Sequence, residues 1–428
     1  MEGLAIIFIC FVICLVLGVP VGYSLALSGI AYIAATGTFD MTSFASVMIN
    51  SVDSFPLLAI PYFILAGALM EAGGISKRIV DFASSLVGWV RGGLAMVAVI
   101  SCAFFAALSG SGIATTAAIG AIMLPEMEKA GYNKAFSAAL IAAAGCLGPI
   151  IPPSVPMVMF GSATETPVTA LLMGGVLPGI LLAILLCGYA YYYARKRNIG
   201  GGDKFSIREC GRAFIKAIPA LLVPIIILGG IYSGYFTPTE SAAIAVVYSF
   251  FAGTVIYHEL TFTRIKNALV GSGTQTGSIL VIAAAATFFG RMLTAEQFQA
   301  HVENFAVNAT DSKILILLVI NLILLVLGCL MDTTPIILIF APILLPIATA
   351  FGVNPVHFGV MMCINLALGL ITPPVGISLY VAAGQAKLPV AEIVKKVVPP
   401  LGILLIGLLL ITYIPSIVTL LPELAGIM

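Results

Sequence analysis

Two short polar stretches interrupt long apolar runs and bring together groups that could bind ions. The first is SGSG at 109–112, and the second is GCLMDTTP at 328–335. A double proline follows each of them, in GPIIPPS at 148–154 and in GLITPPV at 369–375. Because proline has no N–H group, carbonyls about one turn upstream lose their helical partners and can bind a hard cation such as Na⁺. Helices that restart after such breaks offer N–H groups to a carboxylate.

The polar side chains around these breaks are the candidate substrate ligands. Asp332 is the clearest, because an ionisable group within a membrane span is costly and usually functional. Its carboxylate could instead cap the helix that begins at Thr333, although a neutral Ser or Asn would also serve there. Hydroxyl groups at the breaks are further candidates, although Ser and Thr also mediate routine helix packing. The full candidate set is Ser111, Thr115, Thr116, Ser154, Arg291, Asp332, Thr333 and Thr334.

Two ionisable residues at the ends of apolar segments could have either a functional or a structural role, and the sequence favours neither. Arg291 closes a span with no carboxylate nearby in sequence, and Glu240 opens another in TPTESAA. Arg291 could bind an anion or extend to the outer interface, whereas Glu240 could be an ordinary first-turn acid. The histidines His258, His301 and His357 lie far apart in sequence, so no metal site or proton relay is expected from them.

The elements that position these residues must be membrane spans. Of 428 residues, 61% are hydrophobic and 9% are charged, and the mean hydropathy is +1.16. Soluble domains carry about 25% charged residues, so the chain is predicted to be an all-α polytopic membrane protein. A net charge of +1 excludes the basic surface that nucleic acid requires. No nucleotide-binding or hydrolase motif occurs, so we expect no enzyme and no cofactor, and any active transport must use an ion gradient.

Ten apolar segments are predicted to span the membrane, and two longer ones are predicted to be re-entrant hairpins at 91–130 and 311–350. The Lys and Arg residues between 194 and 216 predict that this loop is cytoplasmic. Counting from there, both termini and the 295–312 loop are expected outside. The ten predicted spans are 4–19, 21–36, 56–73, 134–162, 167–193, 214–234, 238–257, 276–293, 356–384 and 397–419.

The chain contains an internal repeat. A shift of 221 residues aligns 121–154 with 342–375 without a gap and gives ten identities, including both double prolines. The loop count gives the two hairpins opposite orientations, which is typical of the inverted repeats of secondary transporters. The predicted division is a first repeat at 1–213, with its hairpin at 91–130 and a broken helix at 134–162. The second repeat at 214–428 has its hairpin at 311–350 and a broken helix at 356–384.

Nearly the whole chain resembles the large membrane subunit, the DctM-type or M subunit, of tripartite ATP-independent periplasmic (TRAP) transporters. The resemblance rests on six blocks in the right order. They are SFPLLAIPYFILAG at 54–67, LSGSGIATTAAIGAIMLPEMEKAGY at 108–132, GPIIPPS at 148–154, YFTPTESAA at 235–243, MDTTPIILIFAPILLPIA at 331–348 and LGLITPPVG at 368–376.

The resemblance implies a fold related to the ion transporter superfamily, an elevator mechanism and coupling to Na⁺. It implies import of organic anions across the bacterial inner (cytoplasmic) membrane. The expected partners are a small membrane subunit of four spans and a soluble periplasmic substrate-binding protein. The implied sodium ligands are Ser109, Gly110, Ser111, Gly112 and Gly148 at the first site, and Gly328, Asp332, Gly369 and Thr372 at the second.

Family substrates include four-carbon dicarboxylates, sialic acid, 2-oxo acids and ectoine-like solutes, and general likeness of the chain favours sialic acid. The alternative is an autonomous sodium/divalent-anion symporter, which has paired hairpins and broken helices but uses no binding protein.

Overall fold

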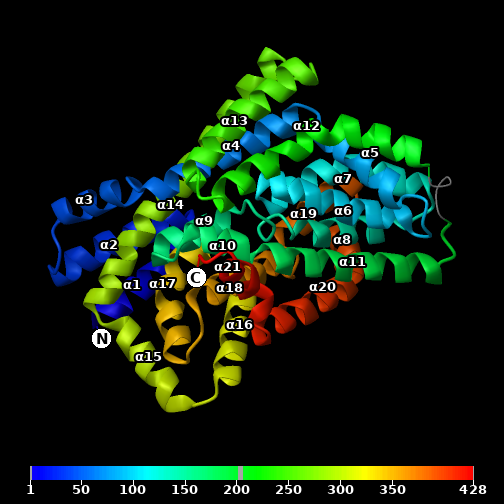
Figure 1. Ribbon diagram of the computed structural model, residues 1–428. Helices are drawn as coiled ribbons and strands as arrows, with labels where there is room; N and C mark the ends of the chain where they lie inside the picture. Colours follow the sequence, from blue (N-terminus) through cyan, green and yellow to red (C-terminus); the bar gives the residue numbers. More distant parts are fainter. Residues whose placement is uncertain (1, 201–205, 428) are drawn as a thin grey trace.

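The computed structural model describes residues 2–200 and 206–427, and within them the regular structure is entirely helical (Figure 1). Eight helical segments are long and apolar enough to cross a membrane. This confirms the prediction of an all-α polytopic membrane protein. Lys204, which belongs to the predicted cytoplasmic loop, and the two terminal residues lie outside the described residues.

The predicted spans of the first half all coincide with helices, and two shorter helices, α3 and α5, were not predicted. The helices are α1 (Glu2–Val16), α2 (Val21–Thr36), α3 (Met41–Val52), the 3₁₀ turn η1 (Phe55–Leu58), α4 (Ala59–Ala72), α5 (Ile75–Val87), α6 (Gly93–Ser109), α7 (Gly112–Lys129), α8 (Lys134–Gly145), α9 (Val155–Thr164), α10 (Val168–Gly174) and α11 (Val176–Lys196).

In the second half, the predicted span at 276–293 is the end of a much longer helix, α14. The helices are α12 (Ile207–Tyr232), α13 (Pro238–Phe251), the π-helical turn η2 (Ala252–Ile256), α14 (Phe262–Ala295), α15 (Phe298–Ala309), α16 (Lys313–Leu330), α17 (Thr333–Ala350), α18 (Pro355–Gly369), α19 (Ile377–Ala386), α20 (Val390–Tyr413) and α21 (Ser416–Leu424). The 295–312 loop contains α15, which packs against α17, and its predicted location outside stays a prediction.

Both predicted hairpins are present, and each turns within two residues. Helix α6 ends at Ser109 and is capped by Gly110, whose φ of 60° is the left-handed conformation that glycine adopts most readily. Ser111 caps α7 by accepting from the Ala114 N–H at 3.3 Å. At the second tip, Asp332 caps α17 by accepting from the Thr333 N–H at 2.8 Å. The depth at which the hairpins enter the membrane stays a prediction.

Both double-proline segments break a helix, as predicted. Residues 146–154 separate α8 from α9, and residues 370–376 separate α18 from α19. The carbonyl oxygens of Gly148 and Ile371 accept no hydrogen bond from the described residues. Each break therefore exposes backbone acceptors that a continuous helix would have used.

Helix bounds in the two halves correspond under the 221-residue shift. Helices α7 and α17 both begin and end in register, and α8 and α18 begin in register. The caps Asn133 and Asn354 correspond, and the Pro152–Pro153 and Pro373–Pro374 bonds are both cis. The boundary between repeats near residue 213 and the opposite membrane orientation of the halves stay predictions.

The two halves interlock through the second arm of each hairpin. Helix α7 packs against α19 of the second half, and α17 packs against α9 of the first half. Helix α4 packs against both α13 and α14, and these three lie along the upper left of the view in Figure 1. The chain thus has a paired-hairpin core beside a wall of α4 and α14.

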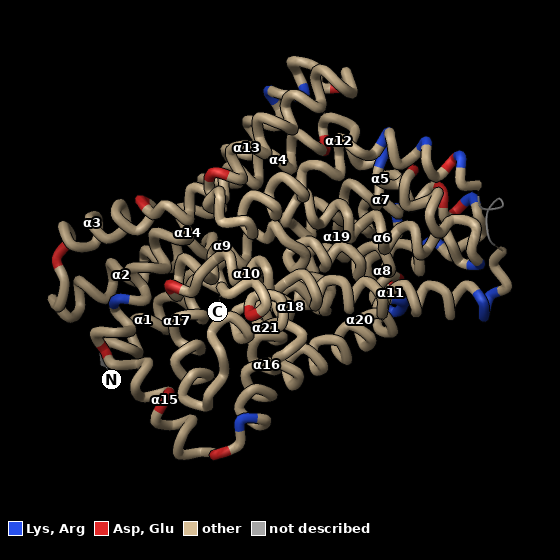
Figure 2. Tube along the Cα trace, viewed as in Figure 1, with Lys and Arg blue, Asp and Glu red and all other residues tan. Residues whose placement is uncertain are grey.

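Charge is distributed unevenly over the molecule. Figure 2 shows most Lys and Arg gathered toward the right of the view, over the ends of α5, α7, α11 and α20. At the left, α1 and α15 carry acidic residues, and acidic residues flank α3 at both ends. The basic loops that the sequence predicts to be cytoplasmic are thus grouped, and the side of the membrane that they face stays a prediction.

Candidate functional site

A cavity of about 470 Å³ lies between the two hairpin tips and the wall of α4 and α14. The first tip contributes residues 109–114, and the second contributes Asp332, Thr333 and Thr334. The start of α9 adds Val155 and Pro156. The fold thus brings together segments that are more than 200 residues apart in sequence.

The first hairpin tip is pressed against the first helix break. A Cβ added to Gly110 would lie 2.6 Å from the Pro153 carbonyl oxygen, and one added to Gly148 would lie 2.7 Å from the Gly112 nitrogen. Real Cβ atoms do not approach other atoms so closely, so glycine is required at both positions unless the backbone moves. The predicted first sodium residues, 109–112 and Gly148, therefore meet in space.

The second hairpin tip meets the second break in the same way. A Cβ on Gly328 would lie 3.3 Å from the Gly369 Cα, and one on Gly369 would lie 2.6 Å from the Gly328 Cα. Thr372, three residues further on, donates its hydroxyl to the Leu368 carbonyl at 2.8 Å. Gly328, Gly369 and Thr372 are thus close together in the structure, but they do not line the cavity.

Asp332 both caps a helix and reaches the cavity. Its Oδ1 accepts from the Thr333 N–H at 2.8 Å and from the Thr333 hydroxyl at 3.4 Å. Its Oδ2 accepts no hydrogen bond from the described residues, and the side chain is exposed at the cavity wall. The capping alternative raised by the sequence is therefore present, and one carboxylate oxygen remains available to a ligand.

Three predicted hydroxyl ligands point into the protein rather than into the cavity. Thr115 and Thr116 are fully buried and donate to the carbonyls of Ser111 and Gly112, at 2.7 and 2.9 Å. Ser154 is also buried and caps α9 while donating to the Pro149 carbonyl. These hydroxyls stabilise the shape of the tip and the break. The Ser109 hydroxyl lies 3.0 Å from the Thr115 hydroxyl, and Ser109 also lines the cavity.

The ionisable residues at the span ends lie away from the cavity. Arg291 is exposed near the end of α14 and does not line it. Glu240 forms a capping box with Thr237, accepting from its N–H at 2.8 Å. Its structural alternative is therefore the one observed.

Sequence analysis missed the wall of the cavity that α4 and α14 form. Helix α14 lines the cavity at helical spacing, mostly with polar or small residues, and α4 contributes Glu71. The α14 residues are Asn267, Ala268, Gly271, Ser272, Gln275, Ser278, Ile279 and Ile282. The spacing of 267, 271, 275, 278 and 282 marks one face of a helix. That periodicity could have revealed the lining face from the sequence. It begins at residue 267, however, before the predicted span at 276–293.

The charge balance of the cavity lining is negative. Glu71 and Asp332 are its acidic residues, and no Lys, Arg or His occurs among the described residues that line it. The N-terminal ends of α7, α9 and α17 supply partial positive charge at the cavity instead. The described residues contain no group of three His, Cys, Asp or Glu side chains that could hold a metal ion. A cation there would be bound mainly by backbone oxygens.

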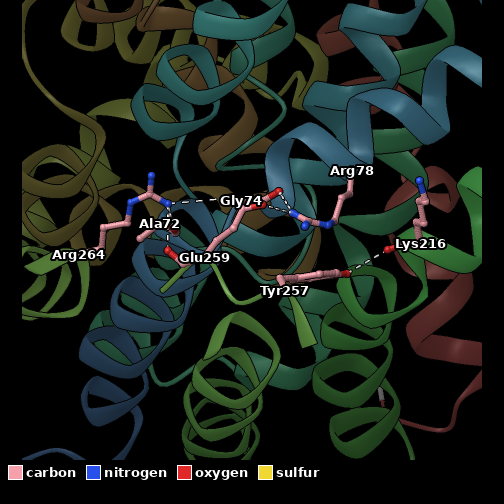
Figure 3. A network of polar contacts seen from close by, with 7 residues as sticks. All are labelled: Ala72, Gly74, Arg78, Lys216, Tyr257, Glu259 and Arg264. Atoms are coloured by element: carbon pink, nitrogen blue, oxygen red, sulfur yellow. Dashed lines mark hydrogen bonds and ion pairs between the residues drawn. The ribbon is translucent and has the colours of Figure 1, made fainter. Parts of the chain in front are cut away.

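A second cavity, of about 740 Å³, adjoins the first and shares Glu71 and Asn267 with it. It extends to Lys77, Glu259 and Arg264 on the side that the sequence predicts to be cytoplasmic. Figure 3 shows the polar network at its rim, where Arg78 pairs with Glu259 at 2.8 Å and Arg264 donates to the Glu259 carbonyl at 3.0 Å. The network ties α5 and α14 to the segment that follows η2.

Solved structures define the class to which this fold belongs. The YdaH transporter of Alcanivorax borkumensis aligns with a TM-score of 0.65 at 14% identity, over 87% of this chain and 88% of that one. MtrF of Neisseria gonorrhoeae aligns with a TM-score of 0.62 at 14% identity, over 87% of this chain and 83% of that one. The chain therefore has the fold of a multi-pass membrane transporter.

Sequence comparisons identify the family. Residues 8–417 match the family described as tripartite ATP-independent periplasmic transporter, DctM component. The chain belongs to this family, so it is a transporter permease and not an enzyme, and the resemblance drawn from its motifs is confirmed.

Three relatives show the range of the family. The isethionate TRAP transporter permease DctMQ of Oleidesulfovibrio alaskensis is 41% identical over 97% of this chain, which spans 66% of that protein. The C4-dicarboxylate large permease DctM of Pseudomonas aeruginosa is 42% identical over 94% of both chains. The sialic acid large permease SiaM of Vibrio cholerae is 38% identical over 95% of both.

Proposed function

We propose that this chain is the large membrane subunit of a sodium-coupled, binding-protein-dependent importer of organic anions in the bacterial inner membrane. Its partners are a small four-span membrane subunit and a soluble periplasmic binding protein. The names of the relatives, which include permeases for isethionate, C4-dicarboxylates and sialic acid, support an organic anion as the substrate.

The observation that carries the proposal is the charge of the cavity. An anion entering a space with two carboxylates and no basic side chain is repelled unless cations neutralise them. Each hairpin tip meets a helix break with free carbonyl oxygens, which suit a hard cation such as Na⁺. We assign one Na⁺ to residues 109–112 with Gly148, and another to Gly328, Asp332, Gly369 and Thr372.

The two adjoining cavities support an elevator movement of the hairpin core along the wall of α4 and α14. The substrate is held between the tips in the first cavity, and the second cavity gives it an exit toward the cytoplasm. Thr115, Thr116 and Ser154 act in this scheme by holding the first tip and break in shape.

The test is uptake of labelled anions into proteoliposomes that contain this chain and its small subunit. Uptake is measured with and without an inward Na⁺ gradient and with and without the binding protein. We expect uptake only when both are present. Uptake that needs Na⁺ alone would favour the autonomous symporter, and uptake that ignores Na⁺ would overturn the proposed coupling.

A further inference from the structure

Two side-chain amides in the wall of the cavity have no partner in the protein. Asn267 and Gln275 on α14 line the cavity and are exposed there, and neither makes a hydrogen bond with the described residues. Their neighbours Ser272 and Ser278 donate instead to carbonyls of their own helix, at 2.7 and 3.0 Å. Among the described polar side chains of α14 that line the cavity, these two amides therefore have free hydrogen-bonding groups.

The position of Gln275 within α14 makes its exposure informative. Helix α14 has 34 residues, and Gln275 is the fourteenth, about 20 Å from the start of the helix at 1.5 Å per residue. Helix α14 is long and apolar enough to cross a membrane, and a polar side chain within such a helix is costly unless it faces water, protein or a ligand. Since the side chain faces the cavity and no protein group, a bound solute is a natural partner.

Charge restricts what that solute can be. An amide donates and accepts hydrogen bonds but does not neutralise a carboxylate. Glu71 lies on the same side of the cavity as Asn267 and would repel a second negative charge there. The helix N-termini at the hairpin tips also line the cavity and can receive one carboxylate.

We propose that Asn267 and Gln275 form a neutral subsite for the hydroxyl or carbonyl groups of an organic monoanion whose carboxylate is bound at the hairpin tips. The inference rests on the proposed function and deepens it, because it names the substrate class as a hydroxylated or oxo monocarboxylate rather than a dicarboxylate. Gln275 contacts the middle of the solute, and Asn267 contacts the end nearer the second cavity.

Four six-carbon probes separate charge from hydroxylation. Gluconate is a hydroxylated monoacid, hexanoate is a plain monoacid, glucarate is a hydroxylated diacid and adipate is a plain diacid. Their binding to the purified large and small subunits in nanodiscs is measured by calorimetry at saturating Na⁺. We expect gluconate to bind most tightly. Tighter binding of either diacid, or no binding of any probe to a preparation that still transports, would overturn the inference.

Variants test the two amides directly. Gln275→Leu should weaken gluconate binding about three- to tenfold, the loss expected for one neutral hydrogen bond, and leave hexanoate unchanged. The control is Thr274→Val. The Thr274 hydroxyl donates to the Val270 carbonyl, and Thr274 lines neither cavity. Equal effects of Gln275→Leu on both probes, or no effect on either, would sink the assignment.

A second variant guards against misfolding of the first. Gln275→Glu keeps the size of the side chain and adds a negative charge, so it should weaken binding of gluconate and hexanoate alike. Unchanged affinity for both would overturn the inference. Sodium-driven uptake by the same preparation distinguishes the two proposals. If uptake persists while the probe preferences fail, only the proposed subsite is wrong. If uptake by the wild type shows no Na⁺ dependence, the proposed function is overturned, and the subsite with it.

Discussion

Gly328 at the second hairpin tip and Gly369 at the second helix break lie in direct backbone contact, with no room for a side chain between them. Gly148, which aligns with Gly369 under the internal repeat, has the same relationship to Ser111 and Gly112 at the first tip. Backbone contact between a tip and a break lets carbonyl oxygens from two segments face one small ion. The two contacts are therefore the parts of the site that substitution should disturb most.

Gly369→Ala and Gly148→Ala should each strongly reduce uptake at limiting Na⁺, because the added methyl group forces the tip away from the break. We expect the Na⁺ concentration for half-maximal uptake to rise at least about tenfold, which corresponds to 1.4 kcal/mol. Gly384→Ala in α19 is the matched control, since a Cβ there meets no atom within 4 Å. Wild-type Na⁺ dependence in both site variants would show that these contacts have no role in coupling.

Asp332 offers a way to separate a helix cap from an ion ligand. Asn at this position keeps an oxygen that can cap α17 but removes the charge, whereas Ala removes both. We expect Asp332→Asn to unfold at nearly the wild-type temperature and yet to require more Na⁺ for uptake. Asp332→Ala should show the same defect and lose about 1 kcal/mol of stability besides. If Asp332→Asn transports normally and only Asp332→Ala is impaired, the residue is a cap and nothing more.

The sequence predicted the hairpins, the breaks and the positions where they meet, because each depends on Gly, Pro, Ser or Asp inside an apolar run. Such residues disrupt a helix wherever they occur in lipid, so their effect on the backbone can be predicted without knowing which distant residues pack against them. The correspondence of Ser111 with Asp332 as helix caps follows from the same local chemistry. These features were readable without the fold.

The wall of the cavity was not readable in the same way. Asn267 and Gln275 lie in a segment too polar to be recognised as a membrane span, and only the packing of α14 against α4 gives them a common face. Conversely, Arg291 was predicted to be a ligand because of its charge. It lies nine residues beyond Ile282, the last α14 residue that lines the cavity, which is about 14 Å further along the helix at 1.5 Å per residue. Which polar residues reach the cavity depends on tertiary packing.

A buried polar pair holds the second hairpin to the second broken helix. Asn365 of α18 is fully buried, and its amide donates to both the side-chain oxygen and the carbonyl of Asn321 in α16, at 2.7 and 2.9 Å. Asn321 in turn donates to the Thr412 hydroxyl of α20 at 3.2 Å. The pair lies one to two turns before Gly369 and Gly328 on their helices, so it should fix the distance between them.

Asn365→Ala should lower the free energy of unfolding by about 1–3 kcal/mol, because two buried acceptors lose their donor. Thermal unfolding in detergent measures this, and Na⁺-dependent uptake should show a raised Na⁺ requirement in the same variant. Asn50→Ala is the control, since Asn50 is exposed and its side chain bonds, among the described residues, the Ser46 hydroxyl alone, at 3.2 Å. Equal unfolding temperatures for the two variants would contradict the assigned role of the pair.

The network at the rim of the second cavity should depend more on Arg78 than on Glu259. Arg78 also donates to the Gly74 carbonyl at 2.8 Å, and its guanidinium lies 3.9 Å from the centre of the Tyr257 ring. Arg78→Ala therefore removes three interactions, whereas Glu259→Ala removes two ion pairs, with Arg78 at 2.8 Å and with Arg264 at 3.9 Å. We expect the first change to cost more stability, and their coupling in a double-mutant cycle to stay below about 1 kcal/mol because the pair is partly exposed.

The pair Glu126 and Lys129 calibrates that measurement, because its oxygen and nitrogen are also 2.8 Å apart but both side chains are more exposed. Its coupling should be close to zero at physiological salt, where exposed charges are screened. Raising the salt should weaken the coupling between Arg78 and Glu259 only in part, since the exposed fraction of the Arg78 side chain is 22%. Equal coupling energies for the two pairs would mean that burial at the cavity rim adds nothing, and that the network does not fix α5 against α14.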